Sequence, residues 1–328
     1  MILVTGAAGF IGSNLAAALN ESGRRDLILC DRLRGGDKWK NIRGRDFDDL
    51  ITPEDLAGWL ERKGQRLSAV LHMGAISSTT VTDGDAVVRE NLRFSLDLLE
   101  FCTAAGVPLV YASSAATYGD GARGFDDDPE PEALARLVPL NLYAFSKHAF
   151  DRIVCRRAKR GERLPPQWAG LKFFNVFGPN EFHKGSMQSV LTKLWPDIAA
   201  GRAVKLFKSA HPDYPDGGQM RDFVYVGDVE RVVLWLLDNP AVSGLFNVGT
   251  GKARSFADFL GAGFAAAGRE PDIVYVDMPE AIRDKYQYFT EARTERLRAA
   301  GYPHAARPLE EAVAEYVGRY LGRQNPYR

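Results

Sequence analysis

The amino-acid sequence predicts an α/β protein with a doubly wound parallel sheet and a smaller α/β unit towards the C-terminus. Short apolar runs alternate with longer helical patterns through the first half of the 328 residues. These runs are apolar throughout, as in parallel strands that are buried on both faces. A glycine-rich turn joins the first run to the first helical pattern. Together, these three observations predict the fold class.

The individual elements follow from periodicity, because apolar residues recur at i, i+3 and i+4 in each predicted helix. The predicted strands of the first half are 2–5, 27–30, 69–72, 108–113 and 171–175. The predicted helices between them are 10–23, 53–64, 85–106 and 142–161.

After residue 177 the alternation becomes less regular. The segment 211–220 is rich in Pro, Gly and Asp and predicts a loop. The segments 221–229 and 244–251 predict a further strand, bracketed by helices, that returns to the first domain, and the helices predicted for a smaller unit are 255–268 and 307–322. We therefore expect one domain of 1–177 plus about 222–250, and a second of about 178–221 plus 251–328.

Composition excludes several classes of function. The 42 basic residues balance 42 acidic ones, which argues against nucleic acid or an anionic membrane as a partner. Three cysteines without a CxxC pair favour a reducing compartment over disulfides or a thiolate zinc site. The five histidines follow no metal-binding pattern, so we predict no metal site. No apolar run reaches about 18 residues, and the N-terminus does not resemble a signal peptide, so we predict a cytoplasmic protein.

The segment TGAAGFIG at residues 5–12 follows the first predicted strand and opens the first predicted helix. Its glycines, Gly6, Gly9 and Gly12, allow a sharp turn and bring backbone N–H groups against a pyrophosphate, while the helix N-terminus adds a favourable dipole. A lone glycine triplet is weak evidence, but this one lies in the strand–turn–helix context that the motif requires. The sequence thus predicts a Rossmann-type sheet that binds a dinucleotide.

The end of the second predicted strand bears on the choice of cofactor. Asp31 is placed to accept hydrogen bonds from the adenosine ribose of NAD. Arg32 and Lys38 follow it and could instead bind the 2′-phosphate of NADP. We predict NADP, with NAD as the alternative.

Two segments carry the predicted chemistry. Tyr143 and Lys147 are four residues apart and share one face of the helix 142–161. A tyrosine hydroxyl with a pKa of about 10 is a poor base at neutral pH, but a neighbouring ammonium and a nicotinamide cation both favour its phenolate. Ser114 follows the strand 108–113 and could hold a substrate hydroxyl. A surface Tyr–Lys pair is the ordinary interpretation of this spacing, but the glycine-rich turn and the serine-ended strand favour catalysis.

In combination these segments resemble the extended short-chain dehydrogenase/reductase family. The matching pieces are TGAAGFIG, Asp31, HMGA (72–75), Asn91, SSAATYG (113–119), YAFSK (143–147) and FNVFGP (174–179). The resemblance implies an NADP-binding domain and a small C-terminal domain for a nucleotide-activated sugar. It also implies that Tyr143 is the acid/base, that Lys147 holds the nicotinamide ribose and that Ser114 positions the substrate. Further cofactor contacts that it implies are Phe10, Ile11, Met73, Gly74, Ala75, Ile76, Ser77, Asn91, Val176 and Lys184.

Within the family, the chain resembles epimerases rather than dehydratases. Sugar-nucleotide dehydratases place an Asp-Glu pair after the active-site Ser or Thr, whereas Ala115 and Ala116 follow Ser114 here. Inversion of a carbinol centre returns hydride to the opposite face of the carbon, so proton traffic gains from a second acid/base group. The segment EFHKGSM at 181–187 offers Lys184 for that purpose.

That segment, with SSTT (77–80) and RDFVYVGDV (221–229), resembles the epimerases of this family that invert the exocyclic C6″ of an ADP-heptose for lipopolysaccharide synthesis. The resemblance implies that Lys184 complements Tyr143 as the second catalytic group and that the enzyme is a homo-oligomer. The substrate contacts that it implies are Ser114, Asn175, Ser186, Lys193, Phe207, Lys208, Ser209, Arg221 and Tyr286.

Two alternatives stay open at this stage. The chain could be another nucleotide-sugar epimerase or a net reductase, neither of which needs Lys184 as a second base. It could also be a non-catalytic NADP-binding protein, which the intact Tyr143 and Lys147 disfavour. The segment 211–220 lengthens the loop before Arg221 relative to the family pattern, so the exact nucleotide also stays open.

Overall fold

The computed structural model describes residues 1–280 and 287–328. In this described part of the chain, the central sheet has seven strands in the order β11-β6-β5-β4-β1-β2-β3. Every pairing in it is parallel. The strands are β1 (Ile2–Thr5), β2 (Leu27–Cys30), β3 (Asp49–Ile51), β4 (Ala69–His72), β5 (Leu109–Ser114), β6 (Trp168–Phe173) and β11 (Gly244–Val248). The predicted doubly wound parallel sheet is confirmed.

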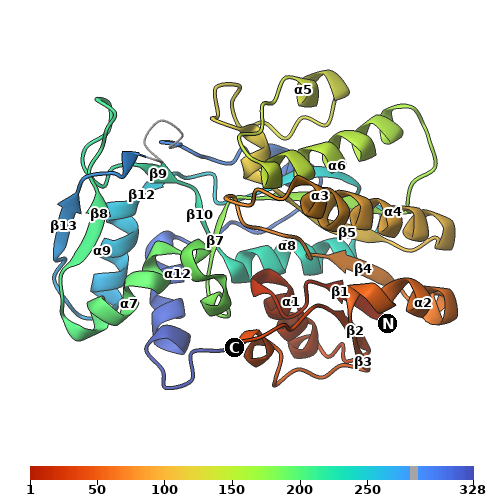
Figure 1. Ribbon diagram of the computed structural model, residues 1–328, viewed down its shortest axis with the longest axis horizontal. Helices are drawn as coiled ribbons and strands as arrows, with labels where there is room; N and C mark the ends of the chain where they lie inside the picture. Colours follow the sequence, from red (N-terminus) through yellow and green to blue (C-terminus); the bar gives the residue numbers. More distant parts are fainter. Residues whose placement is uncertain (281–286) are drawn as a thin grey trace.

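Helices cover both faces of this sheet (Figure 1). On one face, α1 (Phe10–Glu21) and α8 (Val226–Asp238) pack against alternate strand residues such as Val4 and Leu29. On the other, α2 (Pro53–Lys63), α4 (Phe94–Ala105) and α6 (Leu142–Lys159) cover the intervening ones, among them Leu3 and Ile28. Because successive strand residues point to opposite faces, a strand buried on both sides must be apolar throughout.

A further core lies beyond the sheet, where Figure 1 shows α7, α9 and α12 gathered together. It is built from α7 (Val190–Ala200), α9 (Phe256–Ala266) and α12 (Leu309–Tyr316), and the short parallel pair β8 (Val204–Phe207) and β13 (Ile273–Val276) lies beside it. The aromatic side chains of Phe177 and Phe223 join this core to the end of the sheet domain. The division of the chain into two domains, with the bounds given above, stays a prediction.

The helix predicted at 85–106 is continuous but not uniform. It begins as α3 (Gly84–Val87), widens into the π-helical η3 (Val88–Arg93) and continues as α4. A π-helical segment holds one extra residue in a turn and is frequent at functional sites. Here it contains Asn91, one of the predicted cofactor contacts.

Several predicted boundaries are wrong. The strand expected at 171–175 is divided into β6 and β7 (Asn175–Phe177), and β7 leaves the main sheet to pair with β10 (Phe223–Tyr225). The segment 221–229 therefore contributes β10 and the start of α8, and β11 alone returns to the main sheet. The edge strand β3 was not predicted, because its three residues carry no extended apolar run. Among the residues described, no helix is long and apolar enough to cross a membrane.

Candidate active site

The backbone around the turn after β1 is packed so tightly that two of its glycines have no room for a side chain. Gly6 has φ +64°, and a Cβ there would lie 2.7 Å from the Cα of Gly74. A Cβ on Gly12 would lie 2.2 Å from the carbonyl oxygen of Gly6. The bare backbone at the start of α1 thus forms the cradle that a pyrophosphate requires. The residues present fit a dinucleotide cofactor.

The carboxylate of Asp31 lies at the end of β2, beside this cradle. Its Oδ2 accepts a hydrogen bond from the N–H of Ala8 at 2.8 Å, and its Oδ1 accepts one from Lys38 Nζ at 2.5 Å. Arg32 forms ion pairs with Glu54 at 2.6 Å and with Glu90 at 2.7 Å. Both predicted phosphate-binding cations are therefore at the cradle, each already engaged by a carboxylate of the protein.

The segment after β4 closes the other side of the cradle. The N–H of Gly74 donates to Thr5 Oγ1 at 3.2 Å, which holds the predicted contacts Met73, Gly74, Ala75, Ile76 and Ser77 beside β1. Asn91 binds the backbone of Ile76 twice, accepting at 2.7 Å and donating at 3.0 Å. The same side-chain amide donates to Ser146 of α6 at 3.0 Å. The Asn91 prediction thus falls on a residue that fastens this segment to the helix carrying Tyr143.

The structure brings Ser114 and Tyr143 together, and Lys147 lies four residues after Tyr143 on the same helix. Ser114 ends β5, and its hydroxyl is hydrogen-bonded to that of Tyr143. Asn141 caps α6 by accepting from the N–H of Ala144 at 2.9 Å, so Tyr143 lies in the first turn and Lys147 in the second. Lys147 is only 4% exposed, and burial lowers the pKa of its ammonium to about 8.

The electrostatics of Tyr143 differ from the expectation. Burial of the phenolate raises the pKa of Tyr143, and the hydrogen bond with Ser114 only partly opposes this. Asp151, two turns along α6, also raises the pKa of Tyr143. The protein alone therefore keeps Tyr143 protonated at neutral pH, and stabilisation of the phenolate requires positive charge beyond these groups.

Beneath this group lies a buried ion pair that the sequence analysis missed. Lys172 Nζ on β6 lies 2.9 Å from Asp151 Oδ2 and 2.6 Å from Thr117 Oγ1, and both charged side chains are fully buried. Ser113 donates to the same carboxylate oxygen at 2.6 Å, and the Lys172 ammonium lies 4.8 Å from the centre of the Tyr118 ring. The only sequence signal was that Asp151 lies four residues after Lys147. The pair joins α6 to β6, and the hydrogen bond from Ser113 joins the same carboxylate to β5, the strand that ends at Ser114.

Lys184 lies in η5 (Phe182–Met187), against the dinucleotide cradle. Its ammonium is 5.0 Å from the centre of the Phe10 ring, at the first position of α1. Burial lowers the pKa of Lys184, so its proton is easier to remove than that of a solvated lysine. Gly185, with φ +54°, follows it, and the sulfur of Met187 contacts Thr79 Oγ1 at 3.9 Å. The HKGSM segment is thus folded between the cradle and the SSTT segment.

The predicted substrate contacts are spread more widely. Asn175 is exposed on β7, next to Val176, and Lys193 Nζ donates to the carbonyl oxygen of Ser186 at 3.1 Å. Arg221, with a side chain largely buried, lies 5.7 Å from the centre of the Phe256 ring. Phe207 is the last residue of β8, and Lys208 and Ser209 follow it. Lys208 forms an exposed ion pair with Asp277 at 3.0 Å. Tyr286 lies outside the described residues.

Comparison with known proteins agrees with this geometry. The model of the NAD dependent epimerase/dehydratase family matches residues 2–249. The chain belongs to this family, and its cofactor is a nicotinamide dinucleotide.

Individual relatives narrow the comparison. An ADP-L-glycero-D-manno-heptose-6-epimerase of Nitratidesulfovibrio vulgaris is 48% identical over 329 residues, covering 100% of both chains. One from Fusobacterium nucleatum is 44% identical, again over 100% of both. Among solved structures, the Helicobacter pylori ADP-L-glycero-D-manno-heptose-6-epimerase has a TM-score of 0.77 at 28% identity, covering 97% of this chain and 95% of that one. A Thermus thermophilus UDP-glucose 4-epimerase in complex with NAD has a TM-score of 0.74 at 28% identity, covering 97% of both.

Proposed function

We propose that the chain converts ADP-D-glycero-β-D-manno-heptose into ADP-L-glycero-β-D-manno-heptose by transient oxidation at C6″, as a step in lipopolysaccharide inner-core heptose synthesis. The observation that carries the proposal is the place of Lys184. Its half-buried ammonium lies against Phe10 at the dinucleotide cradle, in addition to the Tyr143–Lys147 pair. Identity of 48% over the whole length to a heptose 6-epimerase supports the choice of substrate.

The mechanism needs two proton carriers because the centre is inverted. A nicotinamide dinucleotide held at the glycine cradle and by Lys147 would supply the hydride acceptor and donor for the carbon C6″. One of Tyr143 and Lys184 takes the hydroxyl proton in the oxidation, and the other gives a proton to the carbonyl oxygen in the reduction. Ser114 holds the oxygen at C6″ beside Tyr143, with which it shares a hydrogen bond. Between the two steps the exocyclic group turns about one bond, so the sugar ring keeps its place.

Support for the individual substrate contacts differs among them. Lys193 secures Ser186 through its carbonyl oxygen, two residues after Lys184, which favours a role for both near the reacting carbon. Arg221 is buried at β9 (Met220–Arg221), and its guanidinium suits the substrate diphosphate. Asn175, Phe207, Lys208 and Ser209 remain proposed contacts by resemblance to the family.

For the cofactor we propose NADP, because Arg32 and Lys38 flank the position of the adenosine ribose. A 2′-phosphate would compete with Glu54 and Glu90 for the Arg32 guanidinium. Heat release of the nucleotide from purified protein, followed by mass spectrometry, distinguishes the cofactors by the mass of one phosphate. Recovery of NAD alone would overturn this part of the proposal.

We further propose a homo-oligomer in the cytoplasm. Phe145 on α6 and the preceding loop residues Val138 and Leu140 are 48%, 67% and 51% exposed, which is unusual for large apolar side chains so close together in sequence. Light scattering coupled to size-exclusion chromatography gives the mass in solution. A monomeric mass would contradict the oligomer.

The test of function is proton NMR of the purified protein with ADP-D-glycero-β-D-manno-heptose and no external reductant. We expect the L-glycero diastereomer to appear and approach an equilibrium mixture. Tyr143→Phe and Lys184→Ala should each slow the exchange by at least about a hundredfold. An unchanged spectrum with folded, cofactor-loaded protein would contradict the heptose as substrate, and UDP-sugars would be examined next, because two structural neighbours were solved in complex with them.

A further inference from the structure

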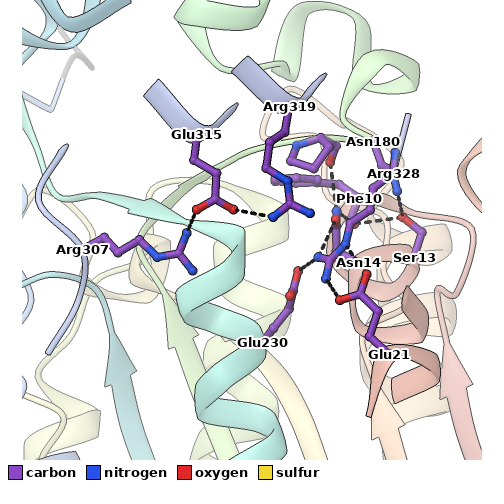
Figure 2. Close-up of polar contacts among 11 residues, drawn as sticks. Phe10, Ser13, Asn14, Glu21, Asn180, Glu230, Arg307, Glu315, Arg319 and Arg328 are labelled. Carbon is purple, nitrogen blue, oxygen red and sulfur yellow. Dashed lines mark hydrogen bonds and ion pairs between the residues drawn. The ribbon is translucent and has the colours of Figure 1, made fainter. Parts of the chain in front are cut away.

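The segment that carries Lys184 is fastened to the C-terminal residues of the sequence. Figure 2 shows Arg328 between Glu21 of α1 and Glu230 of α8, with Asn14 alongside. The Arg328 guanidinium reaches Glu21 Oε2 at 2.8 Å and also forms an ion pair with Glu230. The side chains of Arg328 and Glu230 are 14% and 7% exposed, so this contact is more shielded from solvent than an ordinary surface pair.

The backbone of Arg328 makes the contact that leads towards Lys184. Its N–H donates to Asn180 Oδ1 at 3.0 Å, and the side-chain amide of Asn180 donates to Ser13 Oγ of α1 at 3.0 Å (Figure 2). Asn180 is fully buried and has φ +69°, in the left-handed region that asparagine tolerates better than most other non-glycine residues. Asn14 donates to the carbonyl oxygen of Pro179 at 2.9 Å. One turn of α1 and Arg328 thus fix the residues just before η5.

A ring contact adds a second attachment at the start of η5. The ring of Tyr327 meets that of Phe182 edge-on, with 5.3 Å between their centroids. The guanidinium of Arg43 lies 5.5 Å from the centre of the same Tyr327 ring. Phe182 is two residues before Lys184, so the C-terminal residues reach the lysine segment both at Asn180 and at Phe182.

Other residues of the segment have contacts of their own, because Asn41 Nδ2 lies 3.1 Å from His183 Nδ1 and Gln188 donates to the carbonyl oxygen of Phe182 at 2.7 Å. The contacts from the C-terminal residues add to these in fixing the position of Lys184. Its N–H donates to the carbonyl oxygen of Glu181 at 3.0 Å, and its ammonium rests on the Phe10 ring. The next residue, Gly185, adopts a left-handed conformation and adds freedom to the segment. A lysine has several rotatable bonds, so its reach towards the substrate depends on the position of the backbone that carries it.

We propose that Arg328 is a positioning residue for Lys184, acting through Asn180 to hold the lysine segment against α1. Arg328 lies outside the reacting centre. It connects three parts of the fold at once: α1, α8 and the turn before η5. The effect of Arg328 on catalysis rests on the proposed epimerase function. Its effect on the order of residues 181–187 does not.

The test compares Arg328→Met with a matched control, Arg319→Met. Arg319 is also near the C-terminus, but it pairs with Glu315 on the surface and is 65% exposed. We expect Arg328→Met to lower kcat for epimerisation by about tenfold to a hundredfold, as for a misplaced catalytic group, with KM within about twofold. Arg319→Met should leave both unchanged, and Arg328→Lys should restore part of kcat. In the double variant, Arg328→Met should lower kcat no further than Lys184→Met alone, because the effect of Arg328 on kcat passes through Lys184.

A second measurement separates this inference from the function itself. Hydrogen–deuterium exchange of a peptide over residues 181–187 should be at least about tenfold faster in Arg328→Met than in Arg319→Met, while peptides of β1 and β5 stay protected. If exchange is unchanged, the inference is wrong whatever the enzyme does. If the wild type fails to epimerise the heptose but exchange rises as expected, the functional proposal fails and the positioning role stands. If Arg328→Met lowered kcat by the same factor in the wild type and in Lys184→Met, the catalytic part of the inference would be wrong.

Discussion

Replacing Asp151 with asparagine tests how the buried ion pair supports the active site. The substitution keeps the shape of the side chain and an oxygen for Lys172, but it removes the negative charge 2.9 Å from a fully buried ammonium. Breaking a buried pair by removing one partner costs about 3–5 kcal/mol. A buried lysine that has lost its partner can avoid this cost by giving up its proton, and for an ordinary lysine that costs about 4.6 kcal/mol at pH 7. This value is therefore the upper limit of the expected loss of stability. The expected decrease in unfolding free energy is a large part of the usual total of about 5–15 kcal/mol.

The same reasoning gives a dependence on pH. Loss of a lysine proton costs only about 1.9 kcal/mol at pH 9, so the penalty of Asp151→Asn should shrink towards that value as the pH rises. Urea unfolding of the cofactor-loaded wild type and variant at both pH values measures it. The double variant Asp151→Leu with Lys172→Met is the control, and it should lose less than about 2 kcal/mol because no unpaired charge remains. A loss below about 1 kcal/mol for Asp151→Asn, or one independent of pH, would refute the reasoning.

Two further predictions concern the cradle and its neighbours. Gly12→Ala should abolish retention of the nucleotide, because the new Cβ would lie 2.2 Å from the Gly6 carbonyl oxygen. The control is Gly261→Ala in α9, where nothing lies within 4 Å of the new Cβ. It should bind the nucleotide normally and gain up to about 1 kcal/mol of stability. Nucleotide content after purification and thermal unfolding compare the two, and normal nucleotide content in Gly12→Ala would contradict the steric argument. Burial lowers the pKa of His72 to about 3 in the folded protein. As the pH falls below about 6.5, the imidazole therefore binds a proton in the unfolded state but not in the folded state, and the folded state loses stability. Between pH 7 and pH 5 the wild type should lose about 2 kcal/mol more unfolding free energy than His72→Gln. Equal losses in the two proteins would contradict this prediction.

The sequence predicted most of the elements whose residues carry a repeating pattern. Helix 142–161 was predicted because its apolar periodicity and the YAFSK segment agree, and Tyr143 and Lys147 lie where that spacing placed them. The strand at 171–175 was wrong beyond Phe173, because an apolar run does not reveal that the chain leaves one sheet and pairs with β10 in another. The π-helical turn around Asn91 gave no signal either, because one extra residue in a turn leaves the apolar spacing nearly unchanged.

Contacts between distant segments were the part that no local pattern could supply. Arg328 and Glu21 are separated by 307 residues, and nothing near either of them in the sequence indicates the other. Asn180 followed a motif that was recognised, FNVFGP, but its role depends on Ser13 and on the backbone of Arg328. Such contacts depend on which surfaces the fold brings together, so they are found only once the fold is known.

Comparison of the lysines in and below the site shows why burial alone does not identify a catalytic group. Lys172 is more completely buried than Lys147, yet it is held by a carboxylate and a hydroxyl that stabilise its charge and fix its position. In the described part of the chain, Lys147 has no carboxylate partner, and burial lowers its pKa to about 8. Asp151 offsets this effect of burial only in part, so the charge of Lys147 is available to a phenolate or a ribose hydroxyl. Lys184, whose pKa burial also lowers and whose ammonium rests on an aromatic ring, shares that property with Lys147 and not with Lys172.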